Sequence, residues 1–125
     1  MNIFYCKHCK RIAFSIGGAG EVTCCGEEMT LLLPKEKDAG NEKHLPVVEK
    51  VAENQIKVTI GSVLHPMTPE HWIQWVLVAQ NDRYQVKSFT PSEQPTALFP
   101  FNAQEDLRVY EFCNLHGLWL TQIKK

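Results

Sequence analysis

Hydrophobic and polar residues alternate with a period of two over most of the chain after residue 46. In one such stretch Ile56, Val58 and Ile60 are separated by single polar residues. This alternation is typical of strands that bury one face. Turn residues such as Asn81-Asp82 separate the runs. The pattern predicts about seven strands, near residues 47–52, 55–61, 72–80, 83–90, 96–101, 107–113 and 117–123.

Seven short strands joined by turns at this spacing indicate an all-β fold, a seven-stranded antiparallel immunoglobulin-like β-sandwich. Only residues 65–72 leave room for a helical turn. The sequence has no glycine-rich phosphate loop and no internal repeat. The main candidate functional residues of this chain are therefore its cysteines and histidines.

The first third of the chain differs from the rest. A strand-like run at residues 12–16 is followed by a glycine turn at 17–20, and four of the five cysteines lie within the first 25 residues. So few residues cannot bury a self-sufficient core, and a structural metal is the usual remedy. The charged segment 34–43, which contains proline and glycine, indicates a linker. We therefore expect a small metal-held domain, 1–36, and a β-sandwich domain, 37–125.

Composition narrows the class of protein. The 125 residues include 13 Lys+Arg and 14 Asp+Glu, a balance that gives no electrostatic reason to expect nucleic acid or an anionic membrane as a partner. The apolar runs are too short to span a bilayer, and the N-terminus has no pattern of a secretory signal. We therefore expect a cytoplasmic protein, in which clustered cysteines favour metal ligation over disulfides.

The N-terminal cysteines form one candidate metal site. Cys6 and Cys9 make a C-x2-C knuckle, and Cys24 and Cys25 are adjacent. Four thiolates suit a tetrahedral site for zinc or iron. Adjacent residues in an extended chain point to opposite sides, so both can bind one ion only if the backbone bends between them. His8, inside the knuckle, is interpreted as an exposed loop residue because four thiolates already complete the tetrahedron.

A second candidate site involves one cysteine and four histidines. Cys113 and His116 are three positions apart, after an apolar run. His65 and His71 flank a loop that contains two prolines, and His44 follows the charged segment. Taken singly, a histidine in a β protein is more often a surface or core residue than a ligand. All five residues lie at the edges of predicted segments, and together they predict one assembled metal site.

These motifs together resemble the desulfoferrodoxin family. Cys6-x2-Cys9 with Cys24-Cys25 looks like a desulforedoxin-type iron centre. The second cluster looks like the catalytic centre of superoxide reductases, and it matches at Glu42, Lys43, His44, His65, His71, Cys113 and His116. The resemblance covers essentially the whole chain in the expected order. It implies an enzyme that reduces superoxide to hydrogen peroxide by one electron without producing dioxygen.

The resemblance also implies two iron ions per chain, one in a four-cysteine centre and one in a centre of four histidines and one cysteine. In the second centre four imidazoles would lie in a plane around the iron, with the Cys113 thiolate axial and a sixth position open in the ferrous state. The planar positions fall on His44, His65, His71 and His116.

Two further residues have implied roles at this centre. Glu42 would be the sixth ligand in the oxidised resting state, and Lys43 would lie beside the open position. A lysine there can raise the local concentration of a small anion such as superoxide. The resemblance further implies electron supply by a rubredoxin-like protein, a homodimer, and an anaerobic or microaerophilic cell.

Three alternatives compete with this interpretation. A cupredoxin-like copper electron carrier is also a β-sandwich with a Cys-x2-His segment, but no methionine follows His116 and four histidines exceed the needs of a blue-copper site. A non-catalytic, zinc-stapled binding module would hold zinc in the cysteine site and have no redox activity. A dismutase would also oxidise superoxide to dioxygen.

Overall fold

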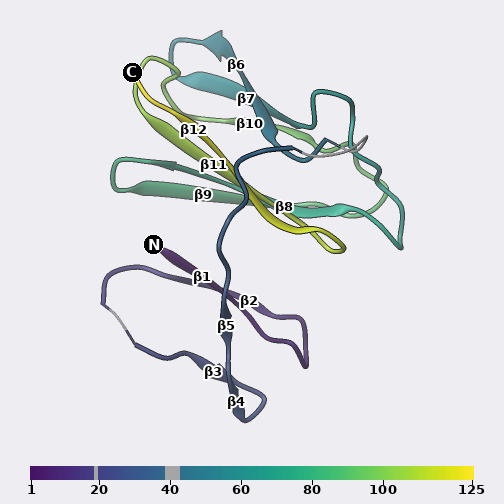
Figure 1. Cartoon of the computed structure of the whole chain (residues 1–125). Coiled ribbons are helices and arrows are strands. Elements are labelled where there is room, and N and C mark those ends of the chain that lie inside the picture. The colour runs from purple at the N-terminus through teal and green to yellow at the C-terminus, as the bar shows by residue number, and fades with distance from the viewer. Residues whose placement is uncertain (19, 39–42) are drawn as a thin grey trace. The chain divides into compact units, whose positions relative to one another are not determined.

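The computed structural model describes residues 1–18, 20–38 and 43–125. Within these ranges the chain forms two compact units, Met1–Leu33 and Pro34–Lys125. All regular structure in the described ranges is strand (Figure 1). Accordingly, no helix in the described part of the chain is long and apolar enough to cross a membrane. Glu42 is outside the described residues.

The first unit is built from very short strands. β1 (Asn2–Tyr5) is the centre of a three-stranded antiparallel sheet, between β2 (Ile12–Ser15) and β5 (Thr30–Leu31). β3 (Thr23–Cys24) and β4 (Glu27–Glu28) form a separate hairpin. The connection between β1 and β2 carries the first two cysteines, and the hairpin carries the other two.

The apolar interior of this unit is small in the part that the structure describes. Ile3, Phe4, Cys6 and Met29 are buried, and the last three form one cluster with a few partly buried neighbours. An interior of this size buries little apolar surface to offset the conformational entropy lost on folding. We therefore expect a bound metal to help hold the unit together.

The second unit is an all-β sandwich, as predicted. One sheet has the order β10-β7-β6, and the other has the order β12-β11-β8-β9 (Figure 1). Every pairing within the two sheets is antiparallel. The strands are β6 (Pro46–Ala52), β7 (Gln55–Ile60), β8 (Ile73–Gln80), β9 (Arg83–Ser88), β10 (Thr96–Phe99), β11 (Leu107–Cys113) and β12 (Gly117–Ile123). All seven predicted strands are present, each within two residues of the predicted bounds.

The core of the sandwich lies between the two sheets. Ile56, Val58 and Ile60 of β7 are fully buried, as their alternation predicts, and they share one apolar cluster with Val76 and Val109 of the other sheet. β8 is buried along most of its length because it is an inner strand of its sheet. The apolar side chains of this core come from both sheets.

The topology brings the candidate ligands to one end of the sandwich. β6 begins two residues after His44, and its antiparallel partner β7 ends five residues before His65. In the other sheet β8 begins just after His71, and β11 ends at Cys113. His116 immediately precedes β12. Antiparallel pairing therefore places the start of one strand beside the end of the next.

Residues 65–72, the stretch that left room for a helical turn, form none. Thr68 and His71 form a two-residue bridge instead, in which the backbone N–H of each donates to the carbonyl of the other at 2.9 and 3.1 Å. The Thr68 hydroxyl also lies 3.2 Å from the His71 N–H. Local side-chain hydrogen bonding of this kind competes with helix formation.

Candidate metal centres

The four N-terminal cysteines lie close together in what we call the four-cysteine group (Cys6, Cys9, Cys24 and Cys25). Their sulfur atoms all lie within 4.8 Å of one another. The Sγ of Cys24 is 3.7 Å from that of Cys9 and 3.9 Å from that of Cys25. A tetrahedral metal with bonds of about 2.3 Å to sulfur separates its ligands by about 3.8 Å. The group therefore fits a tetrahedral iron or zinc ion, and all four cysteines are free of disulfides.

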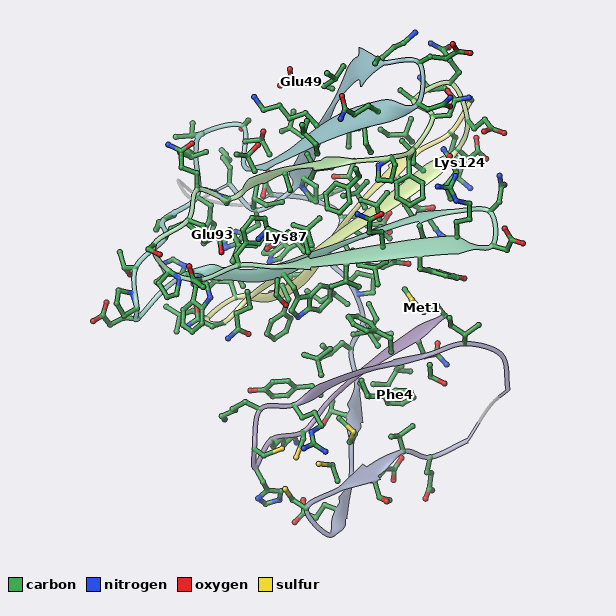
Figure 2. All side chains as sticks on the ribbon, turned by 180° about the vertical axis from the view of Figure 1, so that it is seen from behind. Met1, Phe4, Glu49, Lys87, Glu93 and Lys124 are labelled. Carbon is green, nitrogen blue, oxygen red and sulfur yellow. The ribbon has the colours of Figure 1, made fainter. Side chains whose placement is uncertain are left out.

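A tight turn solves the problem posed by the adjacent cysteines. Cys25 and Gly26 link β3 to β4, with φ angles of +53° and +77°. Two consecutive left-handed residues are characteristic of the type I′ hairpin turn. Because the backbone reverses at Cys25, its thiol reaches the same side as that of Cys24. Figure 2 shows the sulfur atoms of this unit gathered between the β1–β2 connection and this hairpin.

The C-x2-C knuckle is closed by its own backbone. The Lys10 N–H donates to the Cys6 carbonyl at 2.9 Å, and the Cys6 N–H donates to the Arg11 carbonyl at 2.9 Å. Lys10 takes up the left-handed conformation, with φ of +68°. These bonds close the loop that carries the two knuckle thiols.

The thiols of the four-cysteine group differ in acidity. Hydrogen bonds from the backbone N–H groups of Cys9 and His8 lower the pKa of the Cys6 thiol to about 6. Hydrogen bonding with the Cys9 and Cys24 sulfurs raises the pKa of the Cys25 thiol to about 12. The lowered pKa of Cys6 favours its thiolate, whereas the raised pKa values of Cys24 and Cys25 disfavour theirs. A bound cation is what allows all four to ionise together.

His8 lies outside the sulfur group. Its Nε2 is 3.0 Å from a carboxylate oxygen of Glu27, and both side chains are at least half exposed. The hydrogen bond to Glu27 raises the pKa of His8 and lowers that of Glu27. The imidazole thus links the knuckle to β4 as a surface ion pair.

The four other histidines form a closed ring at the end of the sandwich. Each imidazole meets the next edge to face, with centroids 4.7 Å apart for His44 and His65, 4.8 Å for His65 and His71, 5.1 Å for His71 and His116, and 4.9 Å for His116 and His44. The Nε2 of His44 is 3.2 Å from the Nδ1 of His116. The four imidazoles are therefore gathered at one place.

Cys113 adds a thiol to this ring, and we call the five residues together the histidine–cysteine group. Cys113 is fully buried, and its Sγ lies 3.9 Å from the Nδ1 of His116. The ligand atoms of His44, His71, Cys113 and His116 all lie within 4.8 Å of one another. His65 stands beside them, with its ring next to those of His44 and His71. Imidazoles and one thiolate are donors that suit iron or copper.

Neighbouring groups orient two of these imidazoles. The Nδ1–H of His65 donates to the Pro66 carbonyl at 2.8 Å, which leaves Nε2 with the lone pair that a metal requires. The ring of His44 stacks on the indole of Trp119, with centroids 4.5 Å apart and planes 6° from parallel. Both histidines are buried. The rings are therefore held in place by the protein itself.

Asn114 connects the two loops that carry ligands, a role that the sequence interpretation missed. Its Oδ1 accepts from the Trp72 N–H at 2.9 Å, and its Nδ2 donates to the Glu70 carbonyl at 2.9 Å. The residue thus binds the backbone on both sides of His71. An amide between two ligands in the Cys113-x2-His116 motif was the signal available in the sequence.

Lys43, the residue before His44, is half-buried. Its carbonyl lies so close to Gly61 that a Cβ there would collide with it and with the Val63 carbonyl. Gly61 has φ of +88° and donates its N–H to the Leu45 carbonyl at 3.3 Å. A glycine is therefore required where the Lys43–Leu45 backbone crosses the end of β7.

Comparison with known proteins agrees with this geometry. Residues 36–122 match the family model described as desulfoferrodoxin. The chain belongs to the desulfoferrodoxin family. It is 44% identical to the desulfoferrodoxin of Nitratidesulfovibrio vulgaris over 97% of this chain and 95% of that protein. It is 42% identical to the desulfoferrodoxin of Syntrophotalea carbinolica over 98% of this chain and 96% of that protein.

A solved structure gives the same result. The crystal structure of the superoxide reductase from Treponema pallidum matches with a TM-score of 0.75 and 35% sequence identity, over 97% of this chain and 98% of that chain. Membership of the desulfoferrodoxin family, together with the four-cysteine and histidine–cysteine groups, is consistent with two iron centres per chain. These relatives lend no support to the copper-carrier or binding-module alternatives.

Proposed function

We propose that this chain is a superoxide reductase that converts superoxide to hydrogen peroxide without producing dioxygen. The observation that carries the proposal is the closed ring of four imidazoles with the buried Cys113 thiol beside it. Five donors leave one position of a six-coordinate ion for a small ligand. Membership of the desulfoferrodoxin family and the name of the Treponema pallidum relative support the same activity.

Each unit has its own part in the proposal. The first unit, Met1–Leu33, would form a desulforedoxin-like domain with iron held by the four-cysteine group. The second unit, Pro34–Lys125, would form the catalytic domain with iron held by the histidine–cysteine group. The boundary lies at residue 33 rather than at the predicted residue 36, because the backbone of Lys35 bonds to Leu118 and Leu120. Held by the histidine–cysteine group, a ferrous ion would supply the single electron that the reduction needs.

The remaining requirements fall on the protein. Superoxide must take up one electron and two protons to leave as hydrogen peroxide. Cys113 donates electron density as a thiolate, and its complete burial keeps water from weakening it as a donor. Neutral imidazoles, such as the His65 ring fixed by Pro66, add no positive or negative charge. An approaching anion is therefore not repelled by the ligand set.

Lys43 and Glu42 have the proposed catalytic roles. The Lys43 ammonium would attract the superoxide anion and donate hydrogen bonds to it through water. The Glu42 carboxylate would be available as a further ligand for a ferric ion in the resting protein, and would help displace the product. Support for both roles comes from their positions directly before His44 in the sequence.

A product count tests the function. The iron-loaded, anaerobically reduced protein is mixed with a known amount of superoxide, and hydrogen peroxide and dioxygen are measured together. We expect one peroxide per superoxide and dioxygen only at the spontaneous background. One peroxide and one dioxygen per two superoxides would identify a dismutase. No consumption above background by iron-loaded protein would refute the enzymatic function.

The steering role of Lys43 has a separate test. Lys43→Ala is expected to slow the reaction with superoxide and to weaken its dependence on ionic strength, because the attraction of a charge is screened by salt. Lys50→Ala removes an exposed lysine from β6 and serves as the matched control. Equal rates and salt dependence in the two variants would refute the role.

The cellular setting is part of the same proposal. The electron comes from a small rubredoxin-like iron protein, and the chain acts as a homodimer in the cytoplasm of an anaerobic or microaerophilic cell. Reduction without dioxygen release suits such a cell. The donor is tested by adding superoxide and this protein to reduced rubredoxin and recording the absorbance of the rubredoxin. Its oxidation in the presence of this protein would support the donor role.

A further inference from the structure

The charged segment after the first unit does not behave as a linker where the structure describes it. The Lys35 N–H donates to the Leu118 carbonyl at 3.0 Å, and the Leu120 N–H donates to the Lys35 carbonyl at 2.9 Å. Lys35 and Trp119 thus form a parallel bridge along the outer edge of β12. The linker prediction was therefore wrong for Pro34–Asp38, which we call the 34–38 segment.

One end of the 34–38 segment contacts His116. The Nζ of Lys35 donates to the His116 carbonyl at 3.0 Å. The same ammonium lies 4.9 Å from the centre of the Trp119 ring, on which His44 stacks. A cation near an aromatic face is attracted to it. Lys35 therefore holds the backbone of one imidazole ligand and the packing surface of another.

The other end of the segment contacts His44. The Oδ1 of Asp38 accepts from the backbone N–H of His44 at 2.6 Å and from that of Leu45 at 3.2 Å. A carboxylate that accepts two backbone N–H groups makes hydrogen bonds stronger than those of a neutral acceptor. Asp38 thereby fixes the backbone from which the buried His44 ring projects.

We propose that Lys35 and Asp38 are positioning residues of the histidine–cysteine group, and that the 34–38 segment is an outer wall of that centre. His44 and His116 are the imidazoles whose ring nitrogens are 3.2 Å apart, and each has its backbone bonded to one end of this segment. Outer groups that orient metal ligands affect how tightly the ligands hold the ion. The inference rests on the proposed iron centre, and it adds two residues to it.

The charge of Lys35 has an additional effect. A positive charge beside two ligands destabilises the ferric state more than the ferrous state, because the ferric ion carries more charge. Removal of the ammonium is therefore expected to lower the reduction potential of the second iron. An exposed lysine that merely stabilised the fold would leave this potential unchanged.

The experiment compares variants of the full iron-loaded chain. Asp38→Ala removes both hydrogen bonds, Asp38→Asn keeps an acceptor without the charge, and Lys35→Met removes the ammonium while keeping the aliphatic stem. Glu36→Gln and Lys37→Met are matched controls. Both lie in the same segment and are exposed, and the Glu36 carboxylate contacts Gln122 rather than a ligand.

Iron loss to a chelator is measured at both centres of the same molecule, so the four-cysteine centre is the internal reference. We expect Asp38→Ala to speed iron loss from the histidine–cysteine centre by about 10- to 100-fold, with Asp38→Asn intermediate and both controls unchanged. Lys35→Met should lower the reduction potential of that centre, and Lys35→Arg should restore it. The thiolate-to-iron absorption band should shift in the Asp38 and Lys35 variants.

Several results would overturn the inference. One such result is that Asp38→Ala and Lys35→Met match the controls in the rate of iron loss, the position of the thiolate-to-iron band and the reduction potential. In that case the segment does not position the ligands. If Asp38→Ala does not fold, Asp38→Asn and Lys35→Met decide the matter by the same readouts. A failure of the unsubstituted protein to reduce superoxide would refute the proposed function instead, because iron retention is measured without superoxide.

Discussion

Donors of the four-cysteine group all lie between residues 6 and 25, whereas those of the histidine–cysteine group lie between 44 and 116. The first group depends on two tight backbone features, the knuckle and the hairpin turn at Cys25. The second depends on the order of strands in two sheets, packed on a large apolar cluster. A local site thus requires its metal for folding, while a site at the end of a sandwich is built by the fold.

The largest expected difference follows from metal removal. Chelation of both irons should unfold the first unit, because its few buried side chains, which include Ile3, Phe4 and Met29, form only a small core. The sandwich should stay folded on its own core. Hydrogen exchange is the measurement, with loss of protection expected in β1 and β2 and retained protection in β8 and β11. Protected β1 amides in the metal-free protein would contradict this contrast.

Ligand substitutions should separate the two centres spectroscopically. Cys113→Ser is expected to abolish the thiolate-to-iron band of the histidine–cysteine centre and to lower superoxide reduction by at least about 100-fold, since even outer groups change metal sites by roughly 10- to 100-fold. The spectrum of the four-cysteine centre should remain. Cys25→Ala should do the reverse, with the first spectrum lost and superoxide reduction retained. Full activity in Cys113→Ser would exclude the thiol as a ligand.

Two glycine substitutions compare how strongly the backbone of each unit resists an added side chain. Gly61→Ala should destabilise the second unit by about 3 kcal/mol, because the new Cβ meets the carbonyls of Val63 and Lys43 in addition to the strain of a positive φ. Gly26→Ala faces open space, so only backbone strain of about 1 kcal/mol is expected, in the first unit.

The measurement for this pair is denaturant unfolding, followed separately through the absorbance of each iron centre. Each substitution should move the midpoint of its own unit only. Equal destabilisation by the two substitutions would mean that the close approach at Gly61 relaxes at little cost.

The strands could be predicted because their pattern is local. In β7 the buried positions Ile56, Val58 and Ile60 alternate with more exposed ones. The sequence therefore indicates which face of the strand is buried. The four-cysteine group was also visible, since all its members lie close in the chain. Adjacent cysteines in an extended chain would point to opposite sides, and the turn at Cys25 brings their two thiols to the same side.

One assembled histidine–cysteine site was predicted from residues at the edges of segments, and family resemblance supplied its ligand roles, but the geometry of the group could not be predicted. Nothing in the residues around His44 and His116 indicates that their ring nitrogens lie 3.2 Å apart. That proximity depends on sheet order, which a period-two pattern does not specify. Likewise, Lys35 pairs with β12 through backbone groups, which any residue type carries. A charged segment with a proline therefore resembled a linker.

The smallest expected effects concern two surface ion pairs, one in each unit. His8 lies 3.0 Å from Glu27 in the first unit, and Lys87 lies 2.8 Å from Glu93 in the second. Both carboxyl groups have a lowered pKa because of the hydrogen bond from the cation, so each pair stabilises above the usual carboxyl pKa of 4.5 and is lost as pH falls through the lowered value. The partner of the carboxylate is a histidine in the first pair and a lysine in the second.

The pairs should therefore respond differently to rising pH. The raised pKa of His8 means that its contribution is fully present below its ordinary value of 6.5 and is lost as pH rises through the raised value. Glu27→Gln should thus lower the unfolding midpoint of the first unit at about pH 5.5 and leave it unchanged at about pH 8.5, with the neighbouring Glu28→Gln as control. Glu93→Gln should lower the midpoint of the second unit equally at both values, because the partner of Glu93 is a lysine rather than a histidine. An effect of Glu27→Gln that persisted at the higher pH would mean that the carboxylate acts on the four-cysteine centre by a route other than His8.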